Sequence, residues 1–558
     1  MPNGLQEEVR QLRKPRESLR RLLVAFSAGV LVLTSFIATA EASVWTPTFV
    51  VTPDTVGIYL VDSFFNTGEN ISRVTSYQET TTPVGSQHLC VKFGQSPCND
   101  SNLNYTAVVL LPTCVTSSDQ WCIENIAIHG IDAPAVPATL IRSVNGGSTS
   151  GNNVVELPSG GSMGLWKAAG HVNSGGTDTY AGYAVFNAFM GKNAKKFQIA
   201  NFTAMILPYS EKKGAYQRGV AHDQPIGNGI STVAIDGNAL ECAWTEDGLC
   251  GLIQDFPNGV KAEMKIRIGI DLTGWLMGRM QDVIVSVENY SNTQNILTID
   301  AEPVIIPKLY ITAKNTEVTP EIAALSPNRI AGSVGAIDML ANSPGAFSAI
   351  NAWSRLAMNT ASGLTSTWSA TTVPAGSGSP CLSDTSKIQG IVTTNAMAYD
   401  GGSPEFKDGT LNYRVAGYHY NPDGSIFQGR YDLVVRSDVA RCLYGFTKAP
   451  IAATISVTDA NGTNEVAVTN LSDDGTWMHL SATGFTFSSP TIKIKLLQSA
   501  PAPVVSAPTP ISSVADTVLK KPSTKKFRIT CFKPHFTTKV FGTNPKCPAG
   551  YKKMPRSR

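Results

Sequence analysis

The chain has 558 residues, of which 16% are charged and 48 are glycine, and its mean hydropathy is −0.02. The length suits about three or four domains, and the hydropathy argues against a polytopic membrane protein. Few charges, many glycines and polar positions dominated by Ser, Thr and Asn favour extracellular β architecture over a cytosolic helical enzyme.

The net charge of +3 is unevenly distributed along the chain. Residues 517–558 carry twelve Lys and Arg and no acidic residue, whereas residues 43–516 carry 27 basic and 38 acidic residues, a net charge of −11. Because folded surfaces usually mix both signs, the basic C-terminus needs an explanation of its own.

The N-terminus has the pattern of a secretory signal peptide, which we assign to residues 1–42. Six Lys and Arg precede the uncharged, mostly apolar run Leu22–Ala38, and Ala40-Glu41-Ala42 follows. A basic segment, an apolar segment and an A-x-A site predict export, with cleavage after Ala42. The apolar run approaches the length of a bilayer span, so an uncleaved anchor is the alternative. After cleavage we expect no transmembrane span.

Residues 43–311 contain one strand pattern after another. In Lys261–Ile270, the apolar residues Ala262, Met264, Ile266, Ile268 and Ile270 alternate with Lys261, Glu263, Lys265 and Arg267. Because successive side chains of a strand point to opposite faces, we expect the first set in a core and the second in solvent. The other candidates are Asn104–Leu111, Tyr180–Met190, Phe197–Leu207 and Asp282–Val287. Paired glycines separate the runs, and we divide the region into β-rich domains at 43–195 and 196–311.

Residues 312–370 are predicted to form a helical connector. Thr319 and Pro320 precede one helix start, since proline is tolerated in the first turn. A second helix starts at Ser343 and Pro344, where an apolar residue recurs every third position; the set is Phe347, Ile350, Trp353 and Leu356. We interpret this stripe as a face that packs against the sheets.

Residues 371–498 are predicted to form a β-sandwich domain. Ile451–Val457 and Thr491–Leu496 alternate between apolar and polar residues, and the turn signals Asp459–Gly462 and Asp473–Gly475 lie between them. We therefore interpret the whole stretch Ser437–Leu496 as an antiparallel sheet with one face in solvent.

The C-terminus divides into a Pro-rich linker, 499–526, and a basic module, 527–558. The module is too short to hold a core without a disulfide bond. Its cations, with those of the adjoining linker, alternate with aromatic residues and form a candidate site for anionic polymers: Lys520, Lys521, Lys525, Lys526, Arg528, Lys533, Lys539, Lys546, Lys552 and Lys553. Export makes cell-envelope polymers or surface glycans better partners than nucleic acid. The alternative is a solvated tail that keeps the protein soluble.

Ten cysteines predict a set of disulfide bonds. Three successive pairs share a spacing of eight residues: Cys90 with Cys98, Cys114 with Cys122, and Cys242 with Cys250. In an exported chain, this spacing predicts local disulfides, which leaves Cys381 with Cys442 and Cys531 with Cys547. No CxxC occurs and no cysteine pair has a histidine at zinc spacing, so we predict neither a metal nor another cofactor.

Two groups of segments resemble a family of uncharacterised secreted actinobacterial surface proteins. Arg441–Phe446, with Gly484–Ser488 and Ile492–Leu496, resembles a module of these proteins. Ile529–Cys531 with Asn544–Lys553 is similar to their short terminal motif. The resemblance implies an extracellular, β-rich surface protein and brings no known activity.

One motif bears on catalysis. Gly160–Gly164 fits G-x-S-x-G with Ser162 at its centre, and Val154–Leu157 before it is a strand candidate. A nucleophile elbow needs a helix next, but the following residues soon break into glycines, so we interpret the match as chance. The seven histidines form no HExxH motif, and we assign no catalytic residue.

The sequence therefore predicts a mainly all-β chain of tandem antiparallel sandwich-like domains, one or two short helices and a small disulfide-bonded hairpin. We expect a secreted or cell-surface protein without enzymatic activity, for adhesion or envelope structure, held at the envelope by its basic module. The alternatives are an extracellular hydrolase of polysaccharide or ester substrates, and a pore or homo-oligomeric coat subunit.

Overall fold

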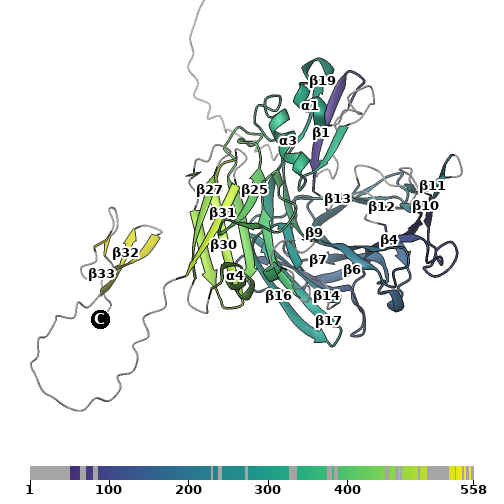
Figure 1. Ribbon diagram of the computed structural model, residues 1–558, viewed down its shortest axis with the longest axis horizontal. Helices are drawn as coiled ribbons and strands as arrows, with labels where there is room; N and C mark the ends of the chain where they lie inside the picture. The colour runs from purple at the N-terminus through teal and green to yellow at the C-terminus, as the bar shows by residue number, and fades with distance from the viewer. Residues whose placement is uncertain are drawn as a thin grey trace, which may run out of the picture. The chain divides into compact units, whose positions relative to one another are not determined.

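The chain forms two compact units, Met1–Ser499 and Ala500–Arg558, in a computed structural model (Figure 1). The structure describes residues 51–62, 71–78, 86–227, 230–236, 242–269, 274–325, 336–373, 380–382, 387–446, 451–458, 464–465, 468–487, 491–498, 527–533, 536–542, 546–547 and 552–553. The fold is mainly β and sandwich-like, as predicted. No helix in these ranges is long and apolar enough to cross a bilayer.

A sixteen-stranded sheet forms the centre of the first unit. Its main path runs β29 (Val468–Asp473), β30 (Trp477–Phe485), β26 (Gly429–Arg436), β22 (Ile388–Thr394), β15 (Gly274–Arg279), β21 (Gly363–Val373), β9 (Gln198–Lys213), β8 (Thr179–Met190), β4 (Asn104–Leu110), β2 (Arg73–Tyr77) and β3 (Gln87–Leu89). Five further strands pair at its side: β6 (Thr139–Thr149), β7 (Gly160–Lys167), β12 (Trp244–Glu246), β13 (Leu249–Ile253) and β18 (Val304–Lys308). Along this path only β15 and β22 pair in parallel.

The predicted boundaries at 195, 311 and 370 do not divide this unit. β8 and β9 pair across residue 195, with Val185 opposite Thr203. β9 in turn pairs with β21, where Ile206 is opposite Trp368. The alternation of side chains shows where a strand lies but not which strand pairs with it. The predicted domain boundaries therefore fall inside one continuous sheet.

A four-stranded antiparallel sheet covers one face of the central sheet. Its order is β16 (Gln281–Ser291), β17 (Gln294–Glu302), β14 (Val260–Gly269) and β5 (Cys122–Gly130). As predicted, Ala262, Met264, Ile266 and Ile268 of β14 are buried, and they share one core with Trp368 of the central sheet. Arg267 departs from the prediction, because its side chain is buried rather than in solvent.

A six-stranded sheet packs on the opposite face of the central sheet. It comprises β23 (Ala398–Tyr399), β24 (Glu405–Lys407), β25 (Thr410–Ala416), β27 (Ile451–Thr458), β28 (Asn464–Glu465) and β31 (Thr491–Gln498). Ile492, Ile494 and Leu496 of β31 are buried, whereas Lys493 and Lys495 are exposed, as the alternation predicts. Because the central sheet is covered on both faces here, β15 and β22 are buried along their whole length.

The start of the predicted sheet Ser437–Leu496 is instead a helix, α4 (Ser437–Tyr444). Its buried residues Val439, Ala440 and Leu443 follow a helical spacing, and Gly445 ends the helix in the left-handed conformation, with φ 65°. The helix is only eight residues long, which is too short for its apolar period to stand out from the strand patterns around it.

Two helices lie beside a small three-stranded sheet. The helices are α1 (Pro320–Leu325) and α3 (Pro344–Trp353), and the sheet has the order β19 (Tyr310–Lys314), β1 (Thr55–Val61) and β20 (Ala336–Leu340). Ser343 caps α3 by accepting the backbone N–H of Ala346 at 3.3 Å. Ile350 and Trp353 are buried in a core shared with β1, which confirms the packing face predicted from the stripe.

The remaining elements are small. β10 (Val220–Gly227) and β11 (Ile230–Asp236) form a two-stranded hairpin, and the short 3₁₀ turns are η1 (Asn153–Val155), η2 (Asn315–Glu317) and η3 (Pro380–Leu382). The second unit holds a three-stranded sheet of β32 (Phe527–Lys533), β33 (Phe536–Gly542) and β34 (Lys552–Lys553). The first two of these form the predicted C-terminal hairpin.

Candidate functional site

Four disulfide bonds lie among the described residues, and they join the cysteines that the spacing pairs. The bonds are Cys90–Cys98, Cys114–Cys122, Cys242–Cys250 and Cys381–Cys442, with Cα separations of 5.1 to 5.7 Å. Cys547 is also disulfide-bonded, and the side chain of Cys531 lies outside the described residues.

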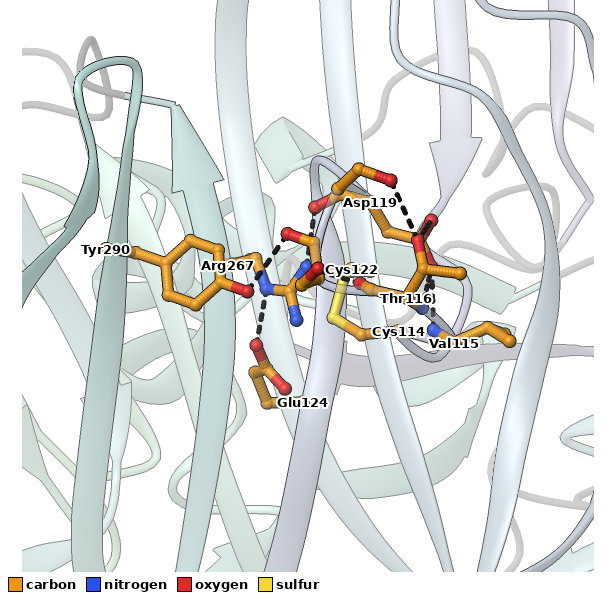
Figure 2. The surroundings of a disulfide bond; sticks show 10 residues. Cys114, Val115, Thr116, Asp119, Cys122, Glu124, Arg267 and Tyr290 are labelled. Carbon is orange, nitrogen blue, oxygen red and sulfur yellow. Dashed lines mark hydrogen bonds and ion pairs between the residues drawn. A yellow bond between two sulfur atoms is a disulfide. The ribbon is translucent and has the colours of Figure 1, made fainter.

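The loop closed by Cys114–Cys122 is ordered by one carboxylate (Figure 2). Asp119 accepts the backbone N–H groups of Val115 and Thr116 at 2.6 and 2.8 Å, and the hydroxyl of Thr116 at 2.6 Å. These hydrogen bonds favour the ionised form and lower the pKa of Asp119 to about 2. The hydrogen bond from the hydroxyl of Thr116 lowers this pKa the most.

A buried arginine joins this loop to the four-stranded sheet. Arg267 of β14 is only 4% exposed, and its Nη1 donates to the carbonyl oxygens of Thr116 and Asp119, both at 2.8 Å. Its Nε donates to the carboxylate of Glu124 on β5. The guanidinium carbon lies 4.3 Å from the ring centre of Tyr290 on β16. Figure 2 shows the guanidinium between the ring of Tyr290 and the disulfide loop.

Tyr290 contacts the loop as well, because its hydroxyl donates to the carbonyl oxygen of Ser117 at 2.9 Å. The four strands β5, β14, β16 and β17 and the loop therefore surround a hollow of about 470 Å³ on the outer face of the sheet. Its lining is Cys114, Val115, Thr116, Ser117, Glu124, Asn125, Lys265, Arg267, Tyr290 and Ile296. A hollow of this volume lies in the range that small-molecule sites occupy.

Two lining residues have hydrogen-bonding groups to offer a ligand. Within the part of the chain that the structure describes, the Nη2 of Arg267 donates no hydrogen bond to protein, although Nε and Nη1 both do. The Oδ1 of Asn125, which is opposite Lys265 in the β5–β14 register, likewise has no hydrogen-bond partner. Nη2 is not among the buried atoms that lack a partner, so it is a solvent-accessible donor that a ligand in the hollow could engage, whereas Oδ1 of Asn125 is a buried acceptor without a partner.

Sequence reasoning missed this site for a physical reason. Arg267 and Glu124 are 143 residues apart, and only the pairing of β14 with β5 brings them together, with Arg267 opposite Cys122. The available signal was the segment Trp121–Glu124, which combines a disulfide cysteine with a carboxylate inside a strand pattern.

The predicted anionic-polymer site lies mostly outside the described residues. Lys546 and Lys552 are exposed in the second unit. The side chains of the other eight predicted residues, Lys520, Lys521, Lys525, Lys526, Arg528, Lys533, Lys539 and Lys553, are not among those that the structure describes.

The G-x-S-x-G match does not form a nucleophile elbow. Gly160–Gly164 lies within β7, where Ser162 is opposite Asn145 of β6. The strand candidate Val154–Leu157 is wrong, since residues 153–155 form the turn η1. An elbow requires a sharp strand-to-helix turn, so this serine lacks the required geometry.

Two histidines, His129 and His88, are held in structural contacts. His129 is buried, with Nδ1 at 2.8 Å from the carbonyl oxygen of Ala133 and Nε2 at 3.1 Å from Asp300. His88 lies 3.2 Å from Asp223. Among the described ranges, no group of three or more His, Cys, Asp or Glu could hold a metal ion.

Comparison with known proteins adds no assignment to this site. No known protein family matches the sequence, and no curated protein is significantly similar to it.

Proposed function

We propose that the protein is an exported, non-enzymatic component of the cell surface that acts in adhesion or envelope structure, retained there by its basic C-terminal module. The observation that carries the proposal is the set of disulfide bonds distributed over the first unit. Such bonds persist in oxidising environments and are rare in the cytosol. The signal-peptide pattern of residues 1–42 supports the same location.

The fold supports a binding or structural role rather than a reaction. The central sheet is covered on both faces at β15 and β22, which gives a rigid body whose loops and outer faces are available for contacts. The G-x-S-x-G match gives the hydrolase alternative no support, because Ser162 lies in a strand.

The charge distribution supports retention by the C-terminus. Residues 517–558 contribute twelve cations and no acid, in contrast to the net −11 of residues 43–516. An anionic polymer is attracted to the first segment and repelled by the second, and salt screens this attraction.

A charge-neutralised variant tests retention. In Lys520→Gln/Lys521→Gln/Lys525→Gln/Lys526→Gln, we expect release from the envelope fraction at a lower NaCl concentration than for the natural protein. The matched control changes four exposed lysines of the first unit, Lys92, Lys167, Lys195 and Lys493, to Gln. It should be released like the natural protein. Equal release of the two variants would contradict the tail's role.

Export has its own test. Edman sequencing of the mature protein should begin at Ser43, and thiol titration under denaturing, non-reducing conditions should find no free cysteine. Ten titratable thiols would contradict an extracellular location.

A further inference from the structure

We propose that the hollow beside the Cys114–Cys122 loop binds a carboxylate-bearing sugar residue, such as a uronic acid. The inference deepens the proposed function, because it names a ligand class for a surface protein, and it rests on the extracellular location. The site is a different one from the basic C-terminus, since its residues all belong to the first unit.

Arg267 supplies the first contact. Its Nε and Nη1 are fully engaged by Glu124 and by two loop carbonyls, so the orientation of the guanidinium is fixed before any ligand arrives. Nη2 is left as the donor that lines the hollow without a hydrogen bond to the described protein. A fixed guanidinium donor pairs well with a carboxylate oxygen, and pre-organisation reduces the entropy lost on binding.

Lys265 supplies a second cation on the same face of β14, two residues from Arg267. Its side chain is 39% exposed, and its Nζ is 3.5 Å from Glu263, its neighbour along the same strand. The hollow is therefore lined by two cations and by the single carboxylate of Glu124, which already accepts from Arg267. With Glu263 counted, two carboxylates balance the two cations, so the attraction for an anionic ligand comes from the N–H donors of Nη2 and Nζ rather than from net charge.

The rest of the lining suits the neutral part of a sugar. Asn125 also lines the hollow, and a side-chain amide there suits the hydroxyl groups of a sugar. Val115 is 85% exposed, and with Ile296 it gives the hollow an apolar side on which the C–H face of a sugar ring can pack. A bare inorganic anion uses neither feature, and Glu124 already offsets part of the arginine charge, so charge alone is a weak source of affinity here.

The test uses the full mature protein and D-glucuronate, with binding followed by NMR saturation transfer and titration. We expect saturable binding that Lys265→Gln weakens about tenfold or more, because a charge-assisted hydrogen bond is lost. Lys493→Gln is the matched control, since Lys493 is an exposed strand lysine on another sheet. It should bind glucuronate as the natural protein does. Unchanged thermal unfolding of both variants shows that they remain folded.

Competition distinguishes the chemical classes. D-glucose and inorganic sulfate should each displace glucuronate about tenfold less effectively than unlabelled glucuronate does, since each lacks one half of the recognised group. Equal displacement by glucose would overturn the role of the carboxylate, and equal displacement by sulfate would overturn the role of the sugar. Absence of saturable binding, or equal binding by Lys265→Gln, would overturn the site.

These outcomes are independent of the retention experiment, because both Lys265→Gln and Lys493→Gln keep the whole basic C-terminus. If glucuronate does not bind but salt release is normal, the envelope proposal stands and the sugar site is wrong. If glucuronate binds but neutralising the C-terminal lysines does not change salt release, the sugar site stands and retention by the C-terminus is wrong.

Discussion

Arg279 of β15 is the most deeply buried cation that the structure describes, with 1% of it exposed. It forms an ion pair with the buried Asp62, at 2.9 Å from Nη2 to Oδ1, and its guanidinium carbon lies 4.2 Å from the ring centre of Tyr399. Nη1 donates to the carbonyl oxygens of Thr394 and Ala396. The partners come from two segments that are distant from Arg279 in the sequence, Asp62 and residues 394–399, so the pair connects the central sheet to its neighbours.

We expect Arg279→Met to lower the free energy of unfolding by about 3–5 kcal/mol, because it leaves Asp62 buried without its partner. The double variant Arg279→Met/Asp62→Leu should be less destabilised, since no charge remains to be buried. Urea unfolding measures both. The control is Arg414→Met at the half-exposed pair with Asp400, which should cost about 1 kcal/mol or less. A double variant no more stable than Arg279→Met would contradict this account.

Asp432 of β26 makes the free energy of unfolding depend on pH. Burial raises its pKa to about 6, although Arg430 lies 2.8 Å away and opposes the rise. Asp282 and Glu302 add repulsion from β16 and β17. Asp432 therefore binds a proton more tightly in the folded state than in the unfolded state. The stability gained from this protonation is complete below the unfolded pKa near 4 and is lost as the pH rises through about 6.

The corresponding measurement compares the natural protein with Asp432→Asn by urea unfolding between pH 4 and 7. On lowering the pH from 7 to 4, the natural protein should gain stability relative to the variant. A difference that stays constant over this range would show that Asp432 does not titrate there.

At the scale of elements, the strands predicted from a clear alternation of apolar and polar residues are present in the fold. β14 and β31 were readable because apolar and polar residues alternate along each of them in the sequence. α3 was readable because Ser343, Pro344 and the apolar stripe all agree. α4 could not be recognised, since the helix is only eight residues long and strand patterns lie on both sides of it. The pairing of β14 with β5, and with it the Arg267 site, depends on contacts across more than a hundred residues that no local pattern contains.

The disulfide bonds should differ in their effect on stability. Cys381–Cys442 spans 61 residues and fixes α4, whereas Cys114–Cys122 spans eight. By the chain-entropy estimate, replacing both cysteines by Ala costs about 4 kcal/mol for the first bond and about 2.5 kcal/mol for the second. Urea unfolding of the two double variants checks the order. A larger loss for the short loop would indicate that the Arg267 contacts, rather than chain entropy, dominate there.

At the scale of the whole molecule, the chain forms two units with a division at Ser499. The sequence predicts a Pro-rich linker from 499 to 526, with trypsin sites at Lys520, Lys525 and Lys526. Limited trypsin digestion should therefore release one stable fragment that begins at Ser43 and ends between Lys520 and Lys526, as mass spectrometry can establish. Early cleavage within β8 or β9 instead would contradict a continuous first unit.

The position of β1 has a consequence for how the chain matures. Thr55 is opposite Lys314 of β19, and Val61 is opposite Leu340 of β20. β1 thus has no partner strand until Lys314, at the end of β19, has been synthesised, and it lacks its second partner until Leu340. In the exported protein that we propose, a chain delivered N-terminus first keeps β1 unpaired until more than half of its residues have been synthesised. Folding of the first unit then requires β1 to pair with β19 and β20, which lie far along the chain. Contacts between residues so distant in the sequence slow folding.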